Sequence, residues 1–153
     1  MFCLFDYIYF CGVNELESLN LTNFNYILNC SINLNNLIIS PNYINLNLNQ
    51  PIQNLIPYII QSLEFILNCL NNKNKIILLD ETGKDDSIIV GIMFLMKIYN
   101  KNFNSIYDSI SNYTQIHPKE YYSSIMNIEY YLIGFQNQYN GINTTQTITK
   151  FIL

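Results

Sequence analysis

A short loop near the middle of the chain gathers most of the side chains that could do chemistry. It consists of Asp80, Glu81, Thr82, Gly83, Lys84, Asp85, Asp86 and Ser87. Four of these residues are acidic and one is basic. Carboxylates in such a loop can act as nucleophiles, hold Mg²⁺, or accept hydrogen bonds from backbone N–H groups. The elements on either side decide which of these uses the geometry allows.

The loop lies between a predicted strand and a predicted helix. Lys75–Leu79 is a short apolar run, which indicates a strand buried on both faces. Ser87–Tyr99 is long enough for a helix, and its stretch Ile88–Met96 has no polar side chain, as expected of a buried helix. That stretch is too short to cross a bilayer, which takes ~20 residues. With Gly83 as its permissive backbone position, such a loop aims several N–H groups and a helix N-terminus at one point, which suits an anion.

The charges of the loop oppose a phosphate. A carboxylate ~4 Å from a phosphate costs about 4 kcal/mol per pair of unit charges at an effective dielectric constant near 20. The helix dipole contributes only ~0.3–1 kcal/mol in the favourable direction. The backbone geometry therefore suits a phosphate ion, and the side chains repel it.

The strand, loop and helix resemble the phosphate-binding loop of the cysteine-dependent dual-specificity phosphatases, His-Cys-x-x-Gly-x-x-Arg-Ser. Laid over that pattern, Leu79 stands at the His, Asp80 at the nucleophilic Cys, Gly83 at the Gly, Asp86 at the Arg and Ser87 at the final Ser. The Gly and the Ser match, whereas the nucleophile and the phosphate-binding Arg do not. The resemblance therefore implies the family's loop without its reactive side chains.

The rest of the chain follows the family's order of elements from about Phe5 to Leu132. Phe5–Cys11 is predicted as a first strand or strand pair, and Asn25–Ser31 resembles the family's strand ending Leu-Asn-Val-Ser. Further predicted elements are short helices at Asn14–Asn20 and Ser105–Tyr113, strands at Leu37–Ser40 and Tyr43–Leu48 (Ile44, Leu46 and Leu48 on one face), a long helix at Ile52–Leu70 with Gln61, Glu64 and Asn68 toward water, and a last helix at Tyr121–Ile133.

The resemblance implies an α/β fold: three layers, α/β/α, with a central, mostly parallel sheet flanked by helices. Residues 1–133 are expected to form the dual-specificity phosphatase-like domain, and residues 134–153 a C-terminal extension. In the family, a loop after one strand carries the general-acid Asp. Here Asn49 or Gln50 takes its place, and neither amide can donate a proton near neutral pH.

Composition narrows the partners and the compartment. The net charge of −4 and the lack of arginine argue against binding nucleic acid or an anionic membrane. The Asn, Ile and Tyr content is typical of an A+T-rich genome. The four cysteines form no Cys-x-x-Cys pair and there is one histidine, so the spacing predicts no zinc site. The first residues make a poor signal peptide, and we expect a cytoplasmic or nuclear protein with reduced thiols.

Cysteine-phosphatase chemistry needs a thiolate, an arginine to bind the phosphoryl oxygens and an acid for the leaving group. None of the three stands at its expected position. The sequence therefore predicts a catalytically inactive pseudophosphatase that acts through an unidentified protein partner, with no cofactor or metal and with weak or no phosphate binding. In this interpretation a carboxylate of Asp80 or Asp86 accepts the loop's N–H bonds in place of phosphate.

A second hypothesis is an Mg²⁺-dependent phosphohydrolase. Asp80-Glu81-Thr82-Gly83 resembles the Asp-Lys-Thr-Gly of haloacid-dehalogenase-type enzymes, whose Asp is the nucleophile. In that case Glu81, Asp85 or Asp86 would help to hold the metal. Those enzymes also use a downstream Asp pair, whereas Asp108 is the only aspartate after Asp86.

Overall fold

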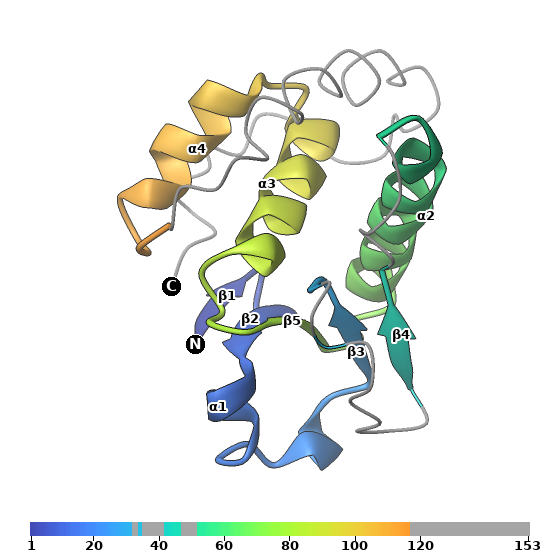
Figure 1. The fold of residues 1–153 in the computed structure, drawn as a ribbon, viewed down its shortest axis with the longest axis vertical. Helices are drawn as coiled ribbons and strands as arrows, with labels where there is room; N and C mark the ends of the chain where they lie inside the picture. Colours follow the sequence, from blue (N-terminus) through green and yellow to red (C-terminus); the bar gives the residue numbers. More distant parts are fainter. Residues whose placement is uncertain (32–33, 35–41, 47–51, 117–153) are drawn as a thin grey trace.

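The computed structural model describes residues 1–31, 34, 42–46 and 52–116 (Figure 1). Several predicted features lie outside these ranges: the strand at Leu37–Ser40, the general-acid position at Asn49 or Gln50, the helix at Tyr121–Ile133 and the extension 134–153. The domain boundary at residue 133 also lies there and stays a prediction.

A five-stranded sheet forms the centre of the described structure. Its strands are β1 (Phe2–Leu4), β2 (Ile8–Gly12), β3 (Tyr26–Asn29), β4 (Tyr43–Asn45) and β5 (Ile76–Asp80). Their order across the sheet is β1-β2-β5-β3-β4, and every neighbouring pair is parallel except β1 with β2. The predicted mostly parallel sheet is confirmed, with β5 at its centre.

Helices cover the two faces of the sheet unequally. The elements are α1 (Val13–Leu16), a 3₁₀ turn at Leu21–Asn23, α2 (Ile52–Asn71), α3 (Asp86–Tyr99) and α4 (Phe103–Ser111). Figure 1 shows α2, α3 and α4 on one side of the sheet and the short α1 on the other. The three-layer α/β/α architecture is confirmed, with one thin outer layer. Among the described residues, no helix combines the length and the apolar character needed to span a membrane.

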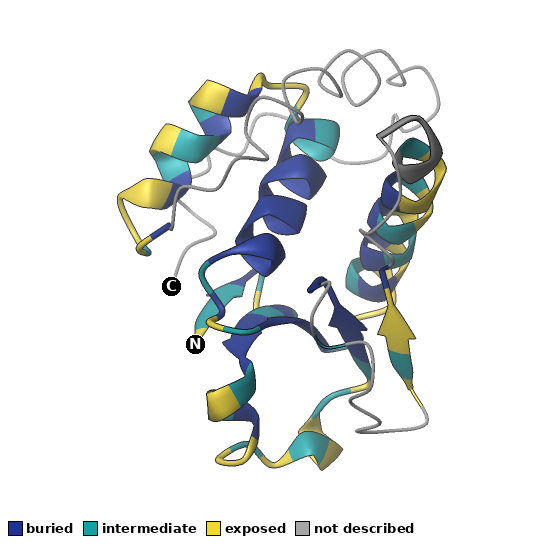
Figure 2. Ribbon diagram, in the orientation of Figure 1, coloured by how far each residue is buried: buried dark blue, intermediate teal, exposed yellow. Residues whose placement is uncertain are grey.

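The alternation of side chains along β5 explains why both faces need cover. Ile76 and Leu78 belong to the larger core under the long helices, whereas Ile77 and Leu79 belong to a smaller core on the α1 side. All four side chains are fully buried, as Figure 2 shows for the centre of the sheet. A central parallel strand has no water-facing side, which is why its sequence is a continuous apolar run.

The two long helices match their sequence patterns. α2 has Ile59, Leu63 and Ile66 buried, and its predicted water-facing residues Gln61, Glu64 and Asn68 are exposed. Every residue of α3 from Asp86 to Met96 is buried. Gly91 lets α3 approach the sheet closely, because a Cβ there would lie 2.5 Å from the Phe10 ring.

Two strand predictions need correction. The segment Phe5–Cys11, predicted as a strand or a strand pair, contains only β2. Phe5 and Asp6, both with positive φ, form the turn of a hairpin whose first strand, β1, precedes the predicted segment. The predicted shared face of Ile44 and Leu46 is also wrong, because Ile44 is 38 % exposed and Leu46 is 3 % exposed. β4 ends at Asn45, so Leu46 no longer follows the alternation of the strand.

Candidate functional site

The acidic loop begins where three parallel strands end together. Gly12 at the end of β2 pairs in register with Asp80 at the end of β5. On the other side of β5, the Cys30 N–H donates to the Leu79 carbonyl at 2.8 Å. Because carboxyl ends of parallel strands meet at one edge, Asp80 is placed between β2 and β3 at that edge of the sheet.

The Asp80 side chain accepts hydrogen bonds from four backbone N–H groups of its own loop. Its Oδ1 accepts from Thr82 N at 2.7 Å and from Gly83 N, and its Oδ2 accepts from Asp85 N at 3.1 Å and Ser87 N at 2.8 Å. The residue has no exposed surface. A buried carboxylate is tolerable only when its oxygens are hydrogen-bonded, and this arrangement meets that condition. The predicted acceptor for the loop N–H groups is therefore present, and it is Asp80.

Asp80 also caps the N-terminus of α3. Asp85 occupies the N-cap position of α3, but its side chain makes no capping hydrogen bond and instead accepts from the Thr82 hydroxyl at 2.8 Å. The second residue of the helix, Ser87, donates its N–H to Asp80. The hydroxyl oxygen of Ser87 is buried and has no hydrogen-bond partner among the described residues. The loop thus depends on Asp80 rather than on the N-cap residue itself.

Two glycines bring the end of β2 against the loop. A Cβ on Gly12 would lie 2.7 Å from the Thr82 carbonyl carbon, and a Cβ on Gly83 would lie 2.7 Å from the Gly12 nitrogen. Gly83 also has a φ of 73°, which favours glycine. The sequence indicated a role for Gly83 in the loop and none there for Gly12. The only feature of the sequence that could have indicated this close contact is the position of Gly12 at the end of the apolar run Ile8–Cys11.

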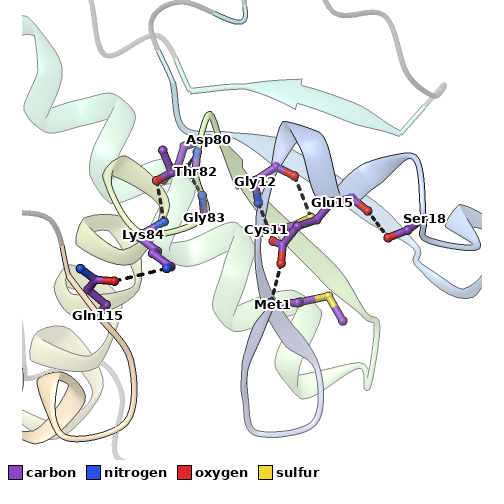
Figure 3. A network of polar contacts seen from close by, with 10 residues as sticks. All are labelled: Met1, Cys11, Gly12, Glu15, Ser18, Asp80, Thr82, Gly83, Lys84 and Gln115. Carbon is purple, nitrogen blue, oxygen red and sulfur yellow. Dashed lines mark hydrogen bonds and ion pairs between the residues drawn. The ribbon is translucent and has the colours of Figure 1, made fainter.

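Figure 3 shows two groups of polar contacts, one from the loop itself and one beside it around the end of β2. The Lys84 ammonium donates to Gln115 Oε1, beyond the end of α4, at 3.4 Å. On the other side Glu15 accepts from the Gly12 N–H at 3.0 Å and pairs with the Met1 amino group at 2.6 Å. Burial alone would raise the pKa of Glu15, but these bonds outweigh it and hold the pKa below its usual value. Glu15 and Gln115 were not among the predicted site residues.

Searches against known proteins identify the fold. No protein-family model and no curated protein sequence matches this chain. Solved structures do match. A leucine-rich repeat and phosphatase domain containing protein from Entamoeba histolytica has a TM-score of 0.67 at 14% sequence identity, over 90% of this chain and 95% of that one.

Two further structures agree with the first. DUSP15 matches with a TM-score of 0.57 at 13% identity, over 84% of this chain and 91% of that chain. The PTP-2 phosphatase of Cydia pomonella matches with a TM-score of 0.55 at 12% identity, over 94% and 96%. The fold is that of the dual-specificity phosphatases.

In this chain the loop that follows the central strand β5 directs four of its backbone N–H groups to the Asp80 carboxylate. The haloacid-dehalogenase alternative is not favoured, because the matched structures have another fold. The Asp80 oxygens are moreover enclosed by N–H groups and hidden from solvent. Within the described residues, no group of three or more His, Cys, Asp or Glu side chains is arranged to hold a metal ion.

A cysteine-phosphatase reaction would need a thiolate, and the environment of each cysteine of this chain disfavours one. Burial, followed by the charges of Asp80 and Asp86, raises the pKa of Cys30 well above its usual value. Burial, followed by the charge of Glu15, raises the pKa of Cys11 to about 12, and burial raises that of Cys69 to about 11. Burial also raises the pKa of Cys3. Burial is thus the main cause that keeps these thiols protonated, and at Cys30 the charges of Asp80 and Asp86 act in the same direction.

These shifts predict the reactivity of the thiols. Alkylation of the native protein by iodoacetamide is expected to speed up about tenfold per pH unit from pH 6 to pH 8, because the thiolate fraction is small and proportional to hydroxide. Cys3, the one cysteine that is not buried, is expected to react first. Peptide mapping of the alkylated protein checks both points. A rate that levels off below pH 7 would reveal an activated thiol and contradict the expectation.

Proposed function

We propose that this protein is a pseudophosphatase: a dual-specificity phosphatase-like fold that does not hydrolyse phosphoesters and acts by binding another protein. One observation carries the proposal. The Asp80 carboxylate, fully buried, accepts hydrogen bonds from the N–H groups of Thr82, Gly83, Asp85 and Ser87. Those donors are the ones that such a loop would offer to a phosphate.

With a carboxylate at the position of the family's thiolate, the loop lacks the group that attacks phosphorus. Its N–H groups are also already bound to that carboxylate and are not open to a phosphate. A phosphate entering the loop would have to displace Asp80 and then lie against its negative charge. At ~4 Å and an effective dielectric constant near 20, that repulsion is about 4 kcal/mol for each pair of unit charges. The chain holds no arginine to offset it, and Asp86 stands at the arginine's position in the family pattern. Phosphate binding at the loop is therefore expected to be weak or absent.

The test is hydrolysis of a generic aryl phosphate by the full chain, with and without Mg²⁺, beside the variant Asp80→Asn. We expect no turnover above background in any of these conditions. Circular dichroism of each sample shows whether it is folded, so that an unfolded variant is not mistaken for an inactive one. Metal-dependent turnover that Asp80→Asn abolishes would make Asp80 a nucleophile and overturn the proposal.

Binding requires a separate measurement. Titration of the protein with a phosphotyrosine peptide and with its unphosphorylated counterpart is expected to give no phosphate-dependent signal at the Gly83 loop. Tight binding that requires the phosphate would refute the part of the proposal that concerns ligands.

We place the interaction in the cytoplasm or nucleus, in line with four cysteines that form no disulfide.

A further inference from the structure

A pocket of about 150 Å³ lies beside the acidic loop, and three segments far apart in the chain line it. The start of the chain and α1 contribute Phe2 and Glu15, the loop contributes Thr82 and Lys84, and the turn after α4 contributes Tyr113 and Thr114. The pocket is large enough for one amino-acid side chain. Its lining includes three consecutive residues of the acidic loop, Thr82, Gly83 and Lys84.

Exposed apolar surface collects at this pocket. Four large hydrophobic residues are exposed among the described residues, and two of them, Met1 at 58 % and Tyr113 at 47 %, line the pocket. Phe2, which is partly buried, lies with them. Apolar side chains around a small polar pocket are typical of a surface that binds another protein.

Lys84 supplies the pocket with an ammonium group that can donate more hydrogen bonds than the one described for it. An ammonium has three donors, and the contact described for it is a long one, 3.4 Å, to the neutral and exposed Gln115 amide oxygen. Figure 3 shows this side chain reaching from the loop toward Gln115. The other charged groups of the pocket neutralise one another, since Glu15 pairs with the Met1 amino group at 2.6 Å.

We propose that this pocket binds a carboxylate side chain, Glu or Asp, of the partner protein, with Lys84 as its ion-pair partner and Met1, Phe2 and Tyr113 around its aliphatic part. This inference rests on the proposed protein-binding function and names where the partner binds. A phosphate dianion fits less well: its second charge would meet no further cation among the described lining residues except the Met1 amino group, which Glu15 already holds.

Gln115 gives the proposal a specific test, because its side chain is the neutral group that Lys84 contacts. The variant Gln115→Glu places a carboxylate of the chain itself beside Lys84. It is expected to compete with the partner's carboxylate and to weaken binding. Because the Gln115 side chain is exposed, the substitution should leave the fold intact. Lys84→Gln removes the cation directly, and both variants should reduce the affinity by about tenfold or more.

The probe is a pool of short random peptides with glutamate fixed at the central position, compared with pools that carry glutamine or phosphotyrosine there. Binding is followed through the backbone amide resonances of the nitrogen-15-labelled full chain. Lys101→Gln serves as the matched control. Lys101 is exposed and follows the far end of α3, a helix whose 14 residues span about 21 Å.

We expect the glutamate pool to shift resonances of Thr82–Lys84, Tyr113 and Thr114. Lys84→Gln and Gln115→Glu, but not Lys101→Gln, are expected to weaken the binding that causes these shifts by about tenfold or more. Equal shifts with the glutamine pool, shifts elsewhere, or none at all would overturn the assignment of the pocket. A response to the phosphotyrosine pool alone would overturn the proposed lack of phosphate binding as well. Hydrolysis of aryl phosphate tests the pseudophosphatase proposal independently, so the two failures can be told apart.

Discussion

Replacing Asp80 by asparagine is expected to lower the free energy of unfolding by about 2–6 kcal/mol, although the two side chains have nearly the same shape. The amide keeps one acceptor oxygen and turns its NH₂ group toward two of the four backbone donors. Two N–H groups of the loop then lose their acceptor in Asp80, at about 1–3 kcal/mol for each group that is buried. The affected donors are either Thr82 and Gly83 or Asp85 and Ser87, which bond the two different oxygens.

Urea denaturation followed by circular dichroism measures this loss. Asp108→Asn is the matched control, because Asp108 is exposed on α4 and the same change there is expected to stay within about 0.5 kcal/mol. If Asp80→Asn were as mild as the control, the carboxylate would not be holding the loop. In that case the main support for the proposed function would be lost.

The sequence predicted those elements in which the buried positions form an uninterrupted pattern of apolar residues. β5 is a run of apolar residues, α2 repeats its apolar residues at helical spacing, and α3 is apolar nearly all round. In all three cases the structure has the predicted element. The turn between β1 and β2 was missed because its positive φ values fall on Phe5 and Asp6 rather than on glycine. Local propensity gives no warning of such a turn.

The candidate site was foreseen in its location and only partly in its bonding. The sequence placed the loop at the end of a buried strand, and it allowed either Asp80 or Asp86 as the acceptor of the N–H bonds. The choice between them depends on which carboxylate points into the loop, and this follows from Asp80 being the last residue of β5. Glu15 and Gln115 could not be foreseen, because their contacts join segments that only the tertiary fold brings together.

The contact between Gly12 and Gly83 joins such segments, and alanine at either position is expected to destabilise the protein by several kcal/mol. At Gly83, alanine must adopt a φ of 73°, which costs roughly 1–2 kcal/mol. Its Cβ would also lie 2.7 Å from the Gly12 nitrogen, and overpacking of this kind adds about 1–3 kcal/mol. The expected loss in free energy of unfolding is therefore about 2–5 kcal/mol.

Gly12→Ala and Asn100→Ala separate the two causes. Gly12 has a φ of −84°, so any loss there comes from the contact of its Cβ with the Thr82 carbonyl group. Asn100 has a φ of 52° at the exposed end of α3 and reports the cost of the left-handed conformation for alanine. If Gly83→Ala costs no more than Asn100→Ala, the loop can move away from β2. The N–H groups around Asp80 would then owe their arrangement to the carboxylate alone. A larger loss at both glycines means that β2 holds the loop in place independently of its charge.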